Sequence, residues 1–492
     1  MTANKINKQK IIFGYDYFFP SGPLPNALDF DATLLNLINS KHQNAKRGSS
    51  IFTSPQLFHT NILGMVRGNP VHHWPVTEYS NLQAANYWDI LDIQMCSVYS
   101  IPPDVKYIYP IVLPPHLNEW ISLDVVHTKP GNFFFNNMSA VARQDVCEGR
   151  ATIFLDFGQE NFISKWDLDN LHQMLDLVNL RGPSRDNSNK IPPEQIVLGH
   201  NTFNGQEIYE NWYSEEERKI TYRNWDSVLH QTSRFYDHEH ANSSALPTLE
   251  ELNKDVIRQY YFVFNNKQPR PWRIDLLLAF ERMGLLENKI NWSWLSDREF
   301  DLDDLKRSLA LFPLDNKSDK DLVQLNSQLP RPLDGEPNST FDNVSAWTDK
   351  DSKHIFLDSY FYLCTETYMD QDGYESITEK IAKPIANGLP FLFASFPGVL
   401  RKLRELGFRT FNGFIDESYD LEPDATKRMV MIGNEVARLC ALSKGVIHEW
   451  YHSQQETLIH NQQNLLKYYQ NSSHTTSLID ELVKKSGGTE DK

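Results

Sequence analysis

Two carboxylates and an ammonium lie close together in residues 359–391, at Glu366, Glu379 and Lys380. Lys380 is expected in the first turn of a helix, where a cation faces the positive end of the macrodipole and loses a few tenths of a kcal/mol. An anionic ligand bound at the start of the helix would remove that conflict. These residue types at this spacing therefore indicate an anion-binding site.

The strands that must position these side chains can be predicted from the same segment. The aromatic run 360–363 predicts a strand, residues 370–373 a loop, and the apolar run 390–394 a second, buried strand. Glu366 would then stand at the carboxyl end of a parallel strand. Ligands of open α/β sheets bind at such ends.

A helix is expected between the two strands, opened by Ser376 and closed by Gly388. Glu379 and Lys380 would occupy its first turn, and Pro384 should kink or break it. The residues from Ser376 to Glu379 also fit the S-x-x-E capping box, in which Glu379 would only satisfy a backbone N–H. Both interpretations of Glu379 remain open at this point.

The segment resembles the donor-binding motif of the α-1,3-fucosyltransferases and their phage and bacterial relatives. The resemblance implies a nucleotide-sugar donor, with the first-turn glutamate on the ribose hydroxyls and the lysine on the diphosphate. Thr367 stands where the family usually has asparagine, so fucose itself is not implied. The matching residues are Glu366, Thr378, Glu379, Lys380, Gly388 and Pro390.

A second strand-to-helix junction lies about 100 residues upstream. Residues 260–264 predict a strand, 265–273 a cation-rich turn, and 274–286 a helix. The related transferases carry an asparagine and an arginine at this junction, and the arginine contacts the donor phosphates. Guanidinium groups bind phosphate oxygens bidentately. The resemblance thus implies donor-binding roles for Asn265, Arg270 and Arg273, whereas an ordinary solvated loop is the alternative.

The resemblance continues through residues 399–420 and so covers roughly residues 260–441. Leucines and a glycine predict a short helix over 399–408, and the aromatic run 409–415 predicts a strand. Asp416 and Glu417 would follow that strand, where either could contact a sugar or a base. A charged surface loop is the alternative.

The amino-terminal half also reads as a parallel sheet with helices. Strands are expected at residues 11–15, 151–160 and 195–199, with a helix over 167–180. In two-domain glycosyltransferases the acceptor binds mainly to the first domain, where a base must take the proton of its hydroxyl. The candidate bases are Asp16, Asp156, Glu160, His72 and His73. Each also fits a solvated loop acid or a hydrogen-bonded histidine.

Composition limits the function classes. The 492 residues suggest two or three domains, and the formal net charge of −16 disfavours nucleic acid as a partner. The four cysteines form no CxxC pair, which indicates reduced thiols inside a cell. The pair His238 and His240 lacks further ligands at a recognised metal spacing. No apolar run of about 20 residues exists, so we expect a cytoplasmic protein without a membrane span.

The prediction is therefore an α/β protein of GT-B-like architecture, with two Rossmann-like domains facing across a cleft. The expected parts are an acceptor-side domain over 1–245, a nucleotide-sugar-binding domain over 246–441, a crossover helix over 442–470 and a mostly flexible tail over 471–492.

The expected activity is inverting, metal-independent transfer of a sugar from a nucleotide-diphosphate sugar to a glycan or other hydroxyl acceptor, without a cofactor. One alternative is a non-catalytic nucleotide-sugar-binding or virion-associated structural protein. Another is an epimerase that acts on the donor alone.

Overall fold

The computed structural model describes residues 9–15, 91–99, 101–112, 140–157, 163–180, 190–226, 228–230, 232–233, 236, 246–296, 298–312, 323, 325–331, 333, 353–369, 373–471 and 473–487. The chain divides into two compact units. Unit 1 comprises Met1–Gln231 and Ser472–Lys492, and unit 2 comprises Thr232–Asn471. Unit 2 is therefore inserted, in sequence, within unit 1.

Unit 1 contains a six-stranded sheet in the order β2-β1-β3-β4-β5-β6. Its strands all pair in parallel. The strands are β1 Gln9–Tyr15, β2 Leu91–Ser97, β3 Tyr107–Val112, β4 Ala151–Phe157, β5 Ile196–Asn201 and β6 Thr221–Trp225. Every residue of β4 and β5 is buried, as expected for inner strands of a parallel sheet.

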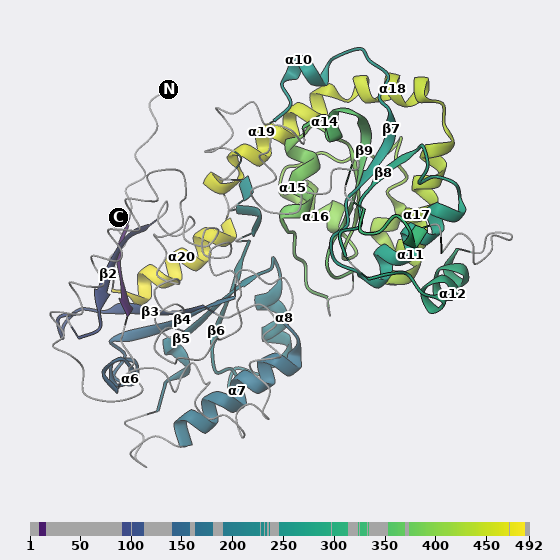
Figure 1. The fold of residues 1–492 in the computed structure, drawn as a ribbon. Coiled ribbons are helices and arrows are strands. Elements are labelled where there is room, and N and C mark those ends of the chain that lie inside the picture. The colour runs from purple at the N-terminus through teal and green to yellow at the C-terminus, as the bar shows by residue number, and fades with distance from the viewer. Residues whose placement is uncertain are drawn as a thin grey trace. The chain divides into compact units, whose positions relative to one another are not determined.

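The described helices of unit 1 are α6 Ala140–Cys147, α7 Lys165–Leu180, α8 Gly205–Trp212 and α20 Ser473–Lys485, with a 3-10 turn at Pro193–Gln195. Helix α20 packs on β6, β1 and β3 (Figure 1). Its apolar residues Leu478, Ile479, Leu482 and Val483 join the core built by Ile11, Ile108, Phe154, Val197 and Trp225. The last helix of the chain thus completes the core of unit 1.

Unit 2 contains a four-stranded parallel sheet in the order β10-β9-β7-β8. The strands are β7 Tyr260–Phe264, β8 Ile290–Trp292, β9 Ser359–Thr365 and β10 Phe391–Ala394. From β7 the chain passes to β8 on one side and then returns to form β9 on the other side. Ligands of open α/β sheets bind outside the carboxyl ends of the strands at such a reversal.

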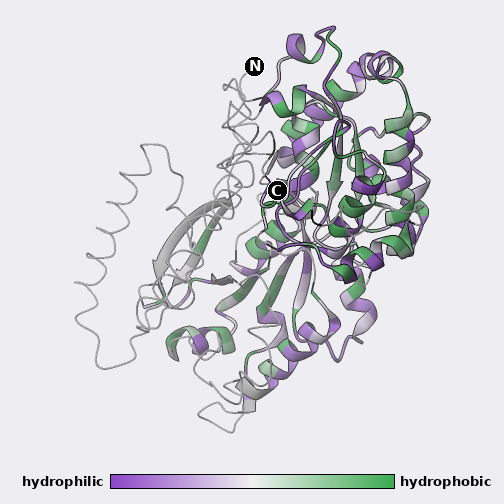
Figure 2. Ribbon diagram, turned by 45° about the vertical axis from the view of Figure 1, so that its right-hand side comes forward, coloured by the Kyte–Doolittle hydropathy of each residue, from purple (hydrophilic) through white to green (hydrophobic). Residues whose placement is uncertain are grey.

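The helices of unit 2 frame this sheet. Those among the described residues are α10 Leu249–Leu252, α11 Pro271–Arg282, α12 Leu302–Leu311, α14 Lys353–Leu357, α15 Glu379–Ala386, α16 Val399–Glu405, α17 Ala425–Ala441, α18 Lys444–Ser453 and α19 Gln455–Asn471, with a 3-10 turn at Ser418–Leu421. Hydrophobic residues concentrate on the strands, whereas the helices alternate hydrophobic and hydrophilic residues along their length (Figure 2). No helix among the described residues combines the length and apolarity needed to cross a bilayer.

The α/β class and the two parallel sheets predicted from the sequence are confirmed. The expected strands at residues 11–15, 195–199, 260–264, 360–363 and 390–394 are present within a residue or two, and the strand expected over 151–160 is described over Ala151–Phe157. That the two domains face each other across a cleft stays a prediction.

Three local predictions are wrong. Helix α15 starts at Glu379 with Thr378 as its N-cap, so Ser376 does not open it. The run 409–415 forms turns rather than a strand, because the Phe411 N–H donates to the Glu417 side chain (2.6 Å) instead of to a ladder partner. The tail over 471–492, predicted to be mostly flexible with one helical piece, is helical over Ser473–Lys485.

Candidate functional site

Glu366 follows β9 and connects this strand to the next helix. Its side chain is fully buried, and the carboxylate accepts from the Thr378 backbone N–H (3.1 Å) and from the Thr378 hydroxyl (2.8 Å). Thr378 is also the N-cap of α15, with extended φ −111° and ψ −175°. A buried carboxylate is stable only when it is hydrogen-bonded or paired, so Thr378 locks the strand end to the helix start.

Lys380 lies between two carboxylates. Its Nζ is 3.1 Å from Glu379 Oε1 and 3.4 Å from Glu366 Oε2, and it also contacts the Thr378 hydroxyl at 3.1 Å. Burial alone would lower the Lys380 pKa, but Glu379 and Glu366 together raise it well above its ordinary value. The ammonium therefore stays charged, and one quarter of the side chain remains exposed.

Glu379 is the first residue of α15 and its side chain is 30% exposed. Burial would raise its pKa, but the neighbouring Lys380 ammonium lowers it below the ordinary value, so this carboxylate is ionised. The capping-box hypothesis required Ser376 as the N-cap and Glu379 three residues later. Since Thr378 is the cap, Glu379 does not have that role.

Arg273, in the first turn of α11, braces the end of β9. Its guanidinium donates to the hydroxyl and to the carbonyl of Thr365, both at 3.0 Å, and to the Gln268 carbonyl at 3.2 Å. Burial lowers the pKa of Arg273 to about 10, which leaves it charged at neutral pH. Because these donors bond to Thr365 and Gln268, Arg273 connects the segment after β7 to the end of β9 rather than facing a ligand.

Arg270 is held differently. It is the N-cap residue of α11, and its guanidinium carbon lies 5.6 Å from the centroid of the Tyr368 ring. Its Nε is buried and finds no hydrogen-bond partner among the described residues. Arg270 therefore keeps a donor available close to the loop that follows Glu366.

Asn265 and Asn266 follow β7 and meet Ser293, just after β8. The Ser293 hydroxyl donates to Asn265 Oδ1 (2.9 Å), and the Asn266 N–H donates to the Ser293 hydroxyl (3.0 Å). Asn266 is fully buried and its Oδ1 lacks a hydrogen-bond partner within the described part of the chain. Asn265 is thus engaged in joining two strand ends, while Asn266 carries an unused acceptor.

The structure thus assembles most of the predicted donor residues at the reversal between β7 and β9. Arg273 contacts the end of β9 directly, and Lys380 contacts Glu366 from the following helix. Trp272 and Tyr368 belong to the same cluster but were not predicted: the Trp272 indole N–H donates to the Glu366 carbonyl at 3.2 Å. An aromatic side chain in each strand-end loop was the available sequence signal.

The predicted bases are mostly outside the described residues. Asp16, Glu160, His72 and His73 all fall there, as do His238 and His240. Asp156 is described. It lies near the carboxyl end of β4, opposite Gly199 of β5, and only 1% of it is exposed. Its role as a base stays a prediction.

Asp416 and Glu417 do not follow a strand. The Glu417 carboxylate accepts from the Phe411 N–H and the Thr410 hydroxyl, and it pairs with Arg404 at 3.1 Å. These contacts hold the turns of residues 409–417 in place. Asp416 borders a small hollow of about 260 Å³ beside α17.

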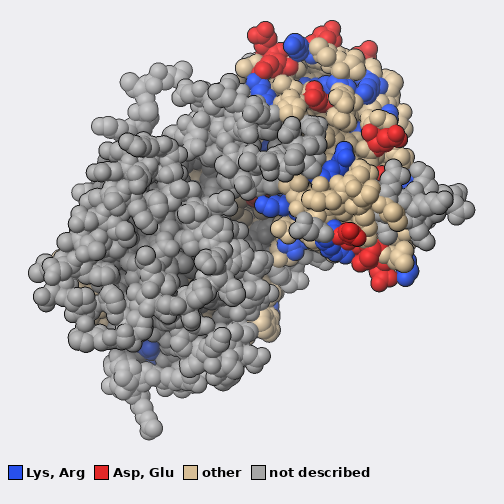
Figure 3. Space-filling model, in the orientation of Figure 1, with Lys and Arg blue, Asp and Glu red and all other residues tan. Residues whose placement is uncertain are grey.

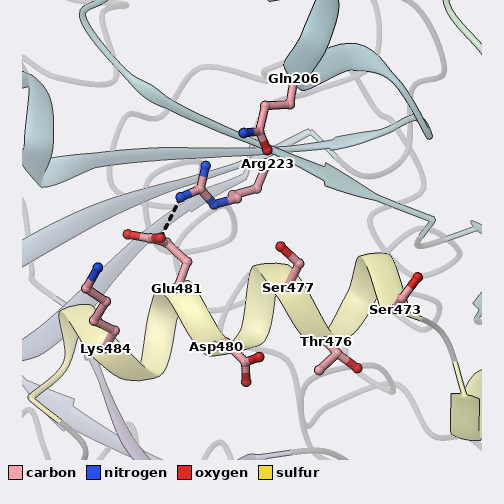
Figure 4. Close-up of a pocket in the computed structure, with 8 residues that line it drawn as sticks. All are labelled: Gln206, Arg223, Ser473, Thr476, Ser477, Asp480, Glu481 and Lys484. Carbon is pink, nitrogen blue, oxygen red and sulfur yellow. Dashed lines mark hydrogen bonds and ion pairs between the residues drawn. The ribbon is translucent and has the colours of Figure 1, made fainter.

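A larger hollow, of about 580 Å³, lies in unit 1 between the start of α8, β6 and α20 (Figure 4). Arg223 and Glu481 form an ion pair of 2.7 Å on its wall. The other lining residues are Gln206, Ser473, Thr476, Ser477, Asp480 and Lys484. Neither hollow includes Glu366, Glu379 or Lys380.

Charges of both signs are interspersed on the part of unit 2 visible in Figure 3. No single-sign patch covers the described residues on this face. Positive charge in this part of unit 2 is thus carried by individual cations rather than by a basic surface.

No protein-family model matches the sequence, and no curated protein sequence matches it. Among solved structures, the chain overlaps with an α,α-trehalose 6-phosphate synthase from Burkholderia multivorans at a TM-score of 0.35 and 11% identity, covering 79% of this chain and 72% of that one. It also overlaps with a UDP-forming α,α-trehalose-phosphate synthase from Burkholderia vietnamiensis at a TM-score of 0.32 and 11% identity, covering 68% and 67%. Overlap at this level does not bear on the activity of the chain.

Proposed function

We propose that this chain is a glycosyltransferase that moves a sugar from a nucleotide-diphosphate sugar to a hydroxyl acceptor. The supporting observation is the cluster at the β7–β9 reversal, where Arg270 and Lys380 bring positive charge and Glu379 presents a part-exposed carboxylate. A reversal of this kind is the common ligand position in open α/β sheets. The resemblance of the same segments to fucosyltransferases agrees with this position.

Each side chain has a distinct role in the proposal. Lys380 and Arg270 would bind the diphosphate and stabilise it as it leaves, which removes the need for a divalent cation at the reacting centre. Glu379 would accept hydrogen bonds from the ribose hydroxyls. Glu366 and Arg273 hold Lys380 and the two strand-end loops in position.

A non-catalytic role is the second candidate, and one observation favours it. Lys380 already has two carboxylates within 3.4 Å, so its charge is compensated without any ligand. A diphosphate would have to compete with Glu379 for the ammonium. A nucleotide-sugar-binding or structural protein with this unit would show the same contacts.

The test combines binding and turnover. Thermal unfolding of the purified chain is measured with GDP, UDP, ADP, CMP and their sugars, because a ligand at 100 times its dissociation constant adds about 2.7 kcal/mol to stability. Release of free nucleotide is then measured with the sugar of the stabilising nucleotide. We expect one nucleotide to stabilise unit 2 and Lys380→Ala to remove that effect.

Lys427→Ala is the matched control. Lys427 is also a first-turn lysine of a unit 2 helix, α17, but it is exposed and lies outside the strand-end cluster. It should leave nucleotide binding unchanged. Binding without turnover would favour the non-catalytic candidate, and stabilisation by no nucleotide would contradict both.

A further inference from the structure

Helix α18 contains two histidines at the spacing of a metal-binding helix. The residues from His448 to His452 read H-E-x-x-H, and all five lie within Lys444–Ser453. Residues four apart project from the same face of a helix. Two imidazoles at this spacing form one half of many zinc sites.

A carboxylate completes the group from a distant part of the chain. Asp255 lies between α10 and β7, and its Oδ1 is 2.8 Å from His448 Nε2. The imidazole rings of His448 and His452 are 4.5 Å apart between centroids. The three potential ligand atoms of this group all lie within 4.8 Å of one another.

We propose that Asp255, His448 and His452 bind a divalent cation of the zinc type. Two imidazole nitrogens and one carboxylate oxygen suit zinc, cobalt or nickel better than magnesium or calcium, which prefer oxygen ligands alone. Three protein ligands leave a fourth position for water in a tetrahedral site.

His448 is already oriented as a metal ligand would be. Its Nδ1 is 3.0 Å from the hydroxyl of Tyr360, a fully buried residue. Metal-binding histidines commonly use the second ring nitrogen for such a bond, which fixes the ring and leaves Nε2 for the metal. Here Nε2 points toward Asp255.

The other two ligands can adapt. His452 makes no hydrogen bond to any residue that the structure describes, so its ring nitrogens are not committed to another partner there. The Asp255 side chain is 95% exposed and can shift by the small distance that coordination requires.

Arg258 opposes the cation and limits its affinity. It adds a positive charge near His452. Its guanidinium, however, is committed elsewhere: it lies 4.0 Å from the Tyr451 ring centroid and donates to the Phe356 carbonyl at 3.3 Å. The negative charge of Asp255 offsets part of this repulsion.

The site is separate from the proposed donor site. Tyr360 belongs to the amino end of β9, whereas Glu366 follows its carboxyl end, so the two groups lie at opposite ends of the same strand. A cation held here would join α18 to the segment that precedes β7. The expected consequence is a more stable unit 2, independent of any transferase activity.

The experiment uses the full chain after dialysis against a chelator. Zinc binding is measured by calorimetry, and cobalt is added as a probe, because its visible absorption reports a tetrahedral site with imidazole ligands. We expect one zinc per chain from this site and a higher melting temperature of unit 2. Asp255→Asn and His452→Ala should each weaken binding at least about tenfold, since even changes outside the ligand shell cost 10- to 100-fold.

His460→Ala is the control, because the chain contains 16 histidines and His460, on α19, bonds the Gly407 carbonyl rather than this group. It should bind zinc as the unsubstituted chain does. Should His452→Ala fail to fold, Asp255→Asn decides alone, since it changes an exposed side chain without changing its shape. Unchanged zinc affinity in Asp255→Asn, or no binding to the unsubstituted chain, would overturn the proposal and leave an ordinary histidine–aspartate hydrogen bond.

Discussion

The first four strands follow the same order in both sheets, but the two sheets have different side chains at the carboxyl ends of their strands. In each, the first strand lies between the second and the third, and the fourth lies beyond the third. In unit 2 the described strand ends gather charged groups, including Arg273, Glu366 and Lys380. In unit 1 the described end of β5 carries His200 and Asn201, both buried.

This difference follows from solvation. Burial lowers the pKa of His200 to about 3, so it is neutral at physiological pH and its Nδ1 is satisfied by the Tyr222 hydroxyl. The cations of unit 2 remain charged because carboxylates and carbonyls surround them. Sheets of the same topology thus carry charged cations at the described strand ends of unit 2 and a neutral, buried imidazole at the end of β5 in unit 1.

The largest expected effect concerns acid unfolding. Burial lowers the pKa of His172 to about 4, of His200 to about 3 and of His230 to about 4. These groups are neutral when folded but take up protons when unfolded, so the stability they contribute above pH 6.5 is lost as the pH falls. At pH 5 each should contribute about 2 kcal/mol less than at pH 7.

Unit 2 should respond less to acid. Burial raises the pKa of Asp275 to about 6, so its contribution grows as the pH falls from 6 toward 3.8, although His452 acts in the opposite direction. Hydrogen exchange at pH 5 and pH 7, resolved by peptide, is the measurement. Unit 1 should lose its protection from exchange first. Equal loss in both units would contradict the claim that the buried histidines make unit 1 more sensitive to acid.

Glu366→Gln should produce the next largest effect. The substitution removes one buried carboxylate partner of Lys380; the amide oxygen can still accept from the Thr378 N–H, so the amide NH2 faces the Lys380 ammonium. We expect unit 2 to lose about 3 kcal/mol, as when one member of a buried pair is removed. Denaturant unfolding followed by tryptophan fluorescence measures this loss, and a change below about 1 kcal/mol would show that water already screens the pair.

Arg273→Lys should produce the smallest effect of the three. A lysine retains the charge but cannot reproduce the fork that spans the Thr365 hydroxyl and carbonyl. We expect a loss of about 2 kcal/mol, typical of hydrogen bonds made by charged groups. Nucleotide binding should weaken as well, because the segments that contain Gln268 and Thr365 lose their connection. If stability falls while binding is fully retained, Arg273 has a structural role only.

Much of this architecture could be predicted from the sequence because its strands are continuous apolar runs. Continuous apolar runs such as 260–264 and 360–363 are typical of inner strands of a parallel sheet. The polar residues that follow them must then lie together at the carboxyl ends of the strands. Which of two nearby residues caps a helix was harder to predict. Ser376 has the spacing of a cap, yet Thr378 caps α15 because Glu366 is positioned to hold it.

Contacts between distant residues could not be predicted. The run 409–415 has strand composition, but Phe411 and Phe414 pack on Trp450 and Glu417 takes the Phe411 N–H. Similarly, the H-E-x-x-H spacing is visible in the sequence, whereas Asp255 lies 193 residues from His448. Only the folded chain brings these groups together.

The return of α20 to unit 1 has a consequence for biosynthesis. All of Thr232–Asn471 leaves the ribosome before the helix that covers Ile11, Ile108 and Trp225. Until α20 is made, the sheet of unit 1 keeps the part of its apolar face that α20 covers exposed to water. During that interval, the uncovered apolar residues of unit 1 are a site at which the growing chain can aggregate.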